Sequence, residues 1–158
     1  MTEKSDEYVD RETGMSFTDA RAMVDEYIDR FSAVVSGAAG NEIRFDHLDE
    51  DGYSSVSRGS ATVGINVIED QGILLFLCQI MKVPEQSRVE LYRRLLELNY
   101  MATSDGAFAI EKDSETVYLR ALRSIGGLDY EEFEDMLHTV AAVADEWDDK
   151  LRAEFPED

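Results

Sequence analysis

Apolar residues recur every three or four positions in three separate stretches of this chain, which is the spacing of one face of an α-helix. The first stretch begins at Ser16, which can cap a helix, and Asp19 lies three positions later. Gly37 and Gly40 follow the last apolar positions and predict the end of the helix. The predicted apolar face consists of Phe17, Ala20, Val24, Tyr27, Phe31 and Val34.

Two further helices are predicted, one over residues 86–101 and one after Asp129. Asp129 can cap the last helix, and Glu132 stands in the capping-box position. Three heptads are too few to require a coiled coil, so the apolar face of this helix favours packing against a core. That face consists of Tyr130, Phe133, Leu137, Val140, Ala144, Trp147 and Leu151.

Strict alternation of apolar and polar residues over 60–67 predicts a half-buried strand. A turn at residues 70–72 separates it from residues 73–83, which are apolar on both faces. This second run therefore predicts a strand in the centre of a sheet, and Pro84 predicts its end.

A hairpin is predicted after the second helix. A turn at residues 104–106 leads into Phe108 and Ile110, and another turn leads into an apolar strand over residues 117–122. Both turns contain the Asp, Ser or Gly residues that such turns favour.

The predicted fold class is α+β: an antiparallel sheet with three helices in the order α-β-β-β-α-β-β-α. Ile43 and Phe45, together with Tyr53 and Val56, indicate the short additional strand that completes this order, interrupted by DHLDEDG. Residues 1–14 have no apolar periodicity and predict a flexible acidic tail. Residues 15–155 predict a single domain.

The net charge of the chain limits the classes of molecule that it can bind. The 158 residues include 35 acidic and 15 basic ones, a formal net charge of -20. Such a surface repels phosphate backbones, so nucleic-acid binding is disfavoured. The acidity and the scarcity of lysine fit both adaptation to high salt and an ordinary well-solvated acidic protein.

Cys78 is the only cysteine, which excludes an internal disulfide and favours a reducing cytoplasm. No apolar run approaches the roughly 20 residues that a membrane helix needs. The amino end lacks the apolar region of a signal peptide. We therefore expect a cytoplasmic protein without a membrane partner.

The acidic loop DHLDEDG, residues 46–52, is the strongest candidate for a cation site. A calcium loop needs acids at its first, third and fifth positions, glycine at the sixth and glutamate at the twelfth. With Gly52 at the sixth position, His47 falls on the first and Arg58 on the twelfth. A solvated acidic turn is therefore the favoured interpretation, and we expect no metal.

No residues at catalytic spacing stand out. His47 and His138 lack a nucleophile in their sequence context, and Cys78 lies in an apolar strand, which favours a buried inert thiol. The glycines of SRGSATVG lack the spacing of a phosphate-binding loop. The sequence predicts neither an enzyme nor a cofactor site.

The second helix and the strand before it carry more apolar side chains than one layer of a monomer needs. A filled core and a surface covered by another chain explain this equally well. The residues that we expect at a dimer or partner contact are Met81, Tyr92, Leu96, Tyr100 and Met101.

A sequence of motifs spans residues 16–152: RGSATVGINV, a helix ending in LELN, a glycine turn into FAI, a VYL strand, LDYEE and a closing helix with AD. In this order it resembles the YbjN family, which shares the fold of type III secretion chaperones. The resemblance implies a non-enzymatic α-β-β-β-α-β-β-α domain, often homodimeric. It also implies that Leu95, Leu98 and Asn99 fix the helix end against the sheet.

The leading hypothesis is a protein-binding module, with a link to stress or regulation that the resemblance implies. It would be dimeric and would bind another polypeptide through apolar and strand-edge surface. The alternative is a regulatory sensor that binds a small ligand or cation through the acidic loop at residues 46–52.

Overall fold

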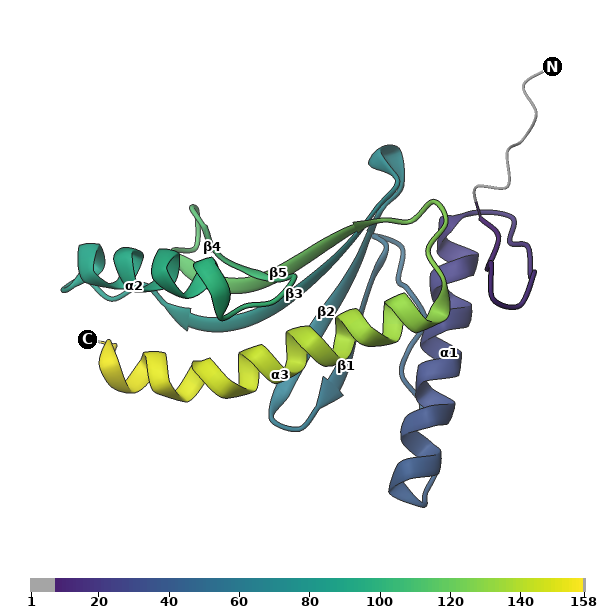
Figure 1. Ribbon diagram of the computed structural model, residues 1–158, viewed down its shortest axis with the longest axis horizontal. Coiled ribbons are helices and arrows are strands. Elements are labelled where there is room, and N and C mark those ends of the chain that lie inside the picture. Colours follow the sequence, from purple (N-terminus) through teal and green to yellow (C-terminus); the bar gives the residue numbers. More distant parts are fainter. Residues whose placement is uncertain (1–7, 158) are drawn as a thin grey trace. The chain divides into compact units, whose positions relative to one another are not determined.

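The computed structural model describes residues 8–157 (Figure 1). The elements are α1 (Ala20–Ala39), β1 (Tyr53–Arg58), β2 (Ala61–Ile68), the 3-10 helix η1 (Glu69–Gln71), β3 (Ile73–Lys82), α2 (Arg88–Met101), β4 (Ala107–Glu111), β5 (Thr116–Ser124) and α3 (Tyr130–Glu154). Within the described residues the strands form one antiparallel sheet in the order β1-β2-β3-β5-β4. The predicted fold class and element order are therefore confirmed, and β3 is the central strand as expected.

The chain is divided into two compact units. The first, which we call the α1 unit, contains the chain up to Val56, Gly64–Leu75 and Leu122–Asp135. The second, the α2 unit, contains Ser57–Val63, Phe76–Ala121 and the chain from Met136 onward. That residues 15–155 form a single domain stays a prediction.

Helix α1 is the main apolar element of its unit. Met23, Val24, Tyr27, Ile28 and Phe31 are all fully buried. The Tyr27 hydroxyl donates a hydrogen bond to the Leu128 carbonyl at 2.8 Å, so burial leaves this polar atom satisfied.

The start of α1 differs from the prediction. Ser16 does not cap it, because Ser16 pairs with Val9 in an isolated β-bridge. The cap is Asp19, whose carboxylate accepts the Ala22 N–H at 2.8 Å. At the other end Gly40 adopts the left-handed conformation and caps the helix as predicted, whereas Gly37 lies within it.

Asp10 organises the turn that precedes α1. Its carboxylate is buried, accepts the N–H groups of Glu12 and Thr13, and forms an ion pair with Arg30 at 3.0 Å. The sequence predicted a flexible tail over residues 1–14. Residues 1–7 lie outside the described residues, and the mobility of the tail stays a prediction.

The strand predicted from Ile43, Phe45, Tyr53 and Val56 is confirmed at Tyr53 and Val56, which lie in β1. Its extension to Ile43 and Phe45 is wrong, because these residues belong to the segment between α1 and β1, which has no strand. This segment ends at Gly52, where the chain has φ +78° and a Cβ atom would lie 2.8 Å from the Val67 carbonyl oxygen. The Val67 N–H donates to the Gly52 carbonyl at 2.8 Å, which fixes the turn to β2. Glycine is required here by both the conformation and the close approach.

In the α2 unit, β4 and β5 form the predicted hairpin, with Phe108 opposite Leu119 and Ile110 opposite Val117. Helix α2 lies against β4 (Figure 1). The Asn99 side chain accepts the Phe108 N–H at 2.7 Å and donates to the Phe108 carbonyl at 3.2 Å. Asn99 thus pairs with β4 as a neighbouring strand would, which agrees with the expected role of this helix end.

The capping box of α3 is confirmed. The Asp129 carboxylate accepts the Glu132 N–H at 2.9 Å, and the Asp129 N–H donates to the Glu132 carboxylate at 3.3 Å. Most of the predicted apolar face is buried, with Tyr130 and Trp147 half-buried.

Replacing Asp10 with alanine is predicted to lower the free energy of unfolding by about 2–3 kcal/mol, because Arg30 and two backbone N–H groups lose a charged partner. Urea titration measures this change. Glu12→Ala, at an exposed side chain of the same turn, is the control and should change stability little.

The loss of unfolding free energy in Asp10→Ala should also depend on pH. Burial alone would raise the pKa of Asp10, but the N–H groups of Thr13 and Glu12 and the Arg30 guanidinium lower it overall. A carboxyl with a depressed folded-state pKa contributes stability above its unfolded pKa, and this is lost as pH falls through the folded value. The difference between wild type and Asp10→Ala should shrink in acid, and a constant difference would contradict this account.

Candidate functional site

Helix α2 has apolar side chains on two faces. Leu91, Leu95 and Leu98 are buried and form its inner face. The opposite side chains are open to solvent: Val89 is 74% exposed, Leu96 71%, Tyr100 85% and Met101 84%. We call these four residues the α2 outer face. Apolar groups this exposed are typical of a surface that another molecule covers.

The predicted contact residues fall into two groups. Leu96, Tyr100 and Met101 belong to the α2 outer face, whereas Tyr92 is half-buried and Met81, at the end of β3, is only 2% exposed. Met81 therefore has little surface to offer a partner. That any of the five contacts another chain stays a prediction.

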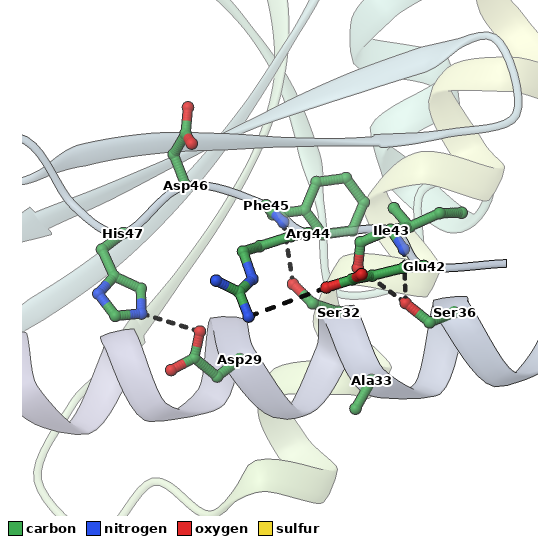
Figure 2. Close-up of a pocket in the computed structure, with 10 residues that line it drawn as sticks. All are labelled: Asp29, Ser32, Ala33, Ser36, Glu42, Ile43, Arg44, Phe45, Asp46 and His47. Carbon is green, nitrogen blue, oxygen red and sulfur yellow. Dashed lines mark hydrogen bonds and ion pairs between the residues drawn. The ribbon is translucent and has the colours of Figure 1, made fainter.

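A second surface lies on α1. Asp25, Asp29, Ser32 and Ser36 are spaced three or four positions apart and form a polar stripe on one side of the helix. We call them the α1 stripe. Residues 43–48 pass along it without a strand of their own (Figure 2).

The two serines of the stripe bind the backbone of this segment. The Ser36 hydroxyl accepts the Ile43 N–H at 2.7 Å and donates to the Ile43 carbonyl at 2.8 Å. The Ser32 hydroxyl accepts the Phe45 N–H at 3.0 Å and donates to the Ile28 carbonyl, which fixes its orientation. The contacts fall on alternate residues of the segment, as they would between two strands.

The two aspartates add contacts further along the segment. Asp25 accepts the Leu48 N–H at 2.8 Å, and Asp29 lies 2.8 Å from the His47 imidazole. On the apolar side, the Phe45 ring stacks on Phe31 with centroids 5.8 Å apart. Six side-chain interactions with α1 therefore position the segment.

A cavity of about 550 Å³ opens between α1 and this segment (Figure 2). No residue from 41 to 50 is buried, and Ile43, Phe45 and Leu48 remain half-buried. The acidic residues of the lining are Asp29, Glu42 and Asp46, and Arg44 and His47 are its basic ones. The lining is formed by Asp29, Ser32, Ala33, Ser36, Glu42, Ile43, Arg44, Phe45, Asp46 and His47.

The acidic loop at residues 46–52 uses its oxygens within the protein. The Asp49 carboxylate accepts the N–H groups of Asp51 and Tyr53, and the Arg21 guanidinium donates to the Asp49 and Glu50 carbonyls. A guanidinium thus binds the loop carbonyls that a cation would need. In the described part of the chain, no three His, Cys, Asp or Glu side chains are grouped to bind a metal ion.

The Cys78 thiol is buried, as predicted. Burial, together with the nearby Asp148 carboxylate, raises its pKa to about 11, so little thiolate forms at neutral pH. His138 is half-buried on α3 and has partners in the structure. Across residues 8–157, no helix is both long and apolar enough to cross a membrane.

Comparison with known proteins identifies the fold. The model of the Tir chaperone protein (CesT) family matches residues 43–148. The ExsC–ExsE complex contains a chain with a TM-score of 0.63 and 22% identity, over 85% of this chain and 97% of that one. No curated protein sequence matches significantly.

Two other similar structures have lower identity. The HopA1–SchA chaperone–effector complex gives a TM-score of 0.61 at 9% identity, over 80% of this chain and 93% of that one. The heterodimeric ExoU–SpcU complex from the type III secretion system of Pseudomonas aeruginosa gives 0.56 at 13%, over 78% and 93%. At these identities the similarity establishes the fold. The YbjN resemblance is not confirmed by name, whereas the type III secretion chaperone fold is.

Sequence reasoning missed the α1 stripe. Its four residues lie on the polar side of an amphipathic helix, where solvent is the usual neighbour. The available signal was the pair Ser32 and Ser36, whose hydroxyls favour local backbone bonding.

The pKa of His47 should fall when Asp29 is replaced with asparagine. The hydrogen bond from His47 to Asp29 raises this pKa above its ordinary value, and the Asp25 and Asp29 charges add to it against partial burial. NMR titration of the imidazole C–H signals measures the change, with Asp145→Asn on α3 as the control.

The linked effect on stability is small because the pair is about half exposed. A histidine with a raised folded-state pKa contributes stability below its unfolded pKa of about 6.5, which is lost as pH rises through the folded value. An unchanged His47 titration in the Asp29 variant would show that the pair does not form in solution.

Proposed function

The chain belongs to the Tir chaperone protein (CesT) family, and we propose that it is a non-enzymatic chaperone that holds a segment of another protein. The family model covers residues 43–148, from the segment on the α1 stripe into α3. Two similar structures are described as a chaperone–effector complex and a complex of the type III secretion system. By analogy, the partner would be an exported effector.

The single structural observation that carries the proposal is the α2 outer face. Its four side chains are more than two thirds exposed although α2 already packs through an inner leucine face. Several large apolar side chains exposed on one helix are typical of a surface that another chain covers.

We also propose a homodimer through this face. Arg93 and Glu97 form an ion pair at 2.8 Å on the exposed side of α2, between Val89 and Tyr100. In a two-fold interface the same helix meets its own copy, so Arg93 can pair with Glu97 of the second copy. Leu96 lies between them in the sequence and would form the apolar centre of the contact.

The charge of the chain favours a basic partner segment. A net charge of -20 attracts cationic polypeptides and repels other acidic proteins. The cytoplasmic location and the stress or regulatory role implied by the sequence belong to this proposal as well. The free, buried Cys78 is compatible with a reducing compartment.

Replacing Leu96 and Tyr100 with glutamate is predicted to convert the dimer to a monomer, because four charges would enter the apolar centre of a two-fold interface. Light scattering over a salt series measures the mass. The control is Val34→Glu, a comparable change at a side chain of α1 that is also exposed. A monomeric wild type at every salt concentration would contradict the dimer.

The chaperone role predicts a stoichiometric protein partner when the tagged chain is purified from cells that produce it naturally. Limited proteolysis of that partner should reveal a segment that is protected only while the chain is bound. Binding should weaken as salt rises, because screening reduces the attraction between the acidic chain and a basic segment. An unrelated acidic protein serves as the control. Proteolysis unchanged by the chain would count against the role.

A further inference from the structure

The α1 stripe binds residues 43–48 through chemistry that any extended polypeptide offers. Ser36 bonds both the N–H and the carbonyl of Ile43, and Ser32 and Asp25 accept the N–H groups of Phe45 and Leu48. These backbone contacts do not depend on which side chains the segment carries. The stripe therefore presents hydrogen-bonding groups that the backbone of another extended segment could also use.

Two side-chain positions add selectivity. Phe45 stacks on the buried Phe31, and His47 lies beside Asp29. Phe45 and His47, two positions apart, thus occupy an aromatic site at Phe31 and an acidic site at Asp29. Asp25 and Asp29 on the helix would bind a permanently charged lysine or arginine more strongly than a histidine that is partly neutral.

Residues 43–48 lie on the surface of the protein and not in its core. None of residues 41–50 is buried, and the cavity of about 550 Å³ separates part of the segment from α1. The segment's hydrogen bonds to α1 are only part-buried, and the His47–Asp29 contact is exposed. A segment that solvent reaches in this way opens at lower cost than one in the core. An incoming chain that makes the same bonds can therefore replace it.

We propose that residues 43–48 are an internal occupant of a polypeptide-binding site on α1. A partner segment with an aromatic residue and a basic residue two positions later displaces them. The inference rests on the proposed chaperone function and adds to it a binding surface separate from the α2 outer face. The segment covers Phe31 when no partner is bound, and the partner covers it afterwards.

Competition with the chain's own segment makes the proposal testable without a natural partner. When the binding-competent state is only a fraction of the population, apparent affinity is reduced by that fraction. Weakening the internal segment must then strengthen the binding of a peptide added in trans. A segment with a purely structural role gives no such gain.

The probe is a fluorescent synthetic peptide with the sequence of residues 41–49, NEIRFDHLD. Anisotropy titration should show weak binding to the wild type. Binding should be about tenfold tighter with the double variant Phe45→Ala, His47→Ala, whose own segment lacks both selective side chains. Adding Ser36→Ala to that variant should weaken binding again, because the receptor loses a bond at both backbone groups.

Peptide variants test the selectivity. NEIRFDKLD should bind more tightly than NEIRFDHLD at pH 8, and NEIRADHLD and a scrambled peptide should bind least. Circular dichroism confirms that each protein variant is folded. His47→Ala alone changes one exposed side chain and should show a smaller gain in the same direction.

Equal peptide affinity for wild type and both weakened variants, or no binding to any, would overturn the internal-occupant proposal. It would leave the chaperone assignment intact, since that depends on the natural partner and on its protection from proteolysis. Conversely, a chain that binds the peptide but has no natural partner would retain the site and lose the proposed function.

Discussion

Helix α2 carries apolar side chains on two faces and only the inner one is buried, so this packing determines which apolar surface the fold leaves exposed. The inner leucines pack within the α2 unit, and Asn99 fixes the helix end to Phe108 of β4 through both backbone groups. The helix therefore cannot rotate to bury its other side without breaking those bonds. Leu96 and Tyr100 are held in water by the same contacts that stabilise the fold.

Local sequence signals predicted most of the helices and strands correctly. The predictions that were wrong involve contacts between residues that lie far apart in the sequence or on different elements. The capping box joins Asp129 and Glu132, which are only three positions apart, so the local sequence determines it. Ser16 failed as a cap because Val9 pairs with it. Ile43 and Phe45 do alternate as in a strand, but their partners are the serine hydroxyls of a helix, which no pattern within the segment reveals.

The scarce basic residues are largely engaged within the protein. Arg30 neutralises the buried Asp10, Arg21 binds the carbonyls of the acidic loop, and Arg94 pairs with Glu154. Each contact uses a cation to satisfy a local polar group and leaves fewer positive charges for partners. The excess of acid therefore faces solvent, where it disfavours binding of anionic chains and favours basic segments.

Exposed apolar surface carries a risk of aggregation unless another segment or chain covers it. The two surfaces proposed above solve this problem in different ways. The α2 outer face would be covered by its own copy in a dimer, whereas Phe31 is covered by Phe45 of the same chain. Covering a site with an internal segment lowers the apparent affinity for every partner by the same factor. Selectivity is kept, because only segments that fill both the aromatic and the acidic position recover the lost contacts.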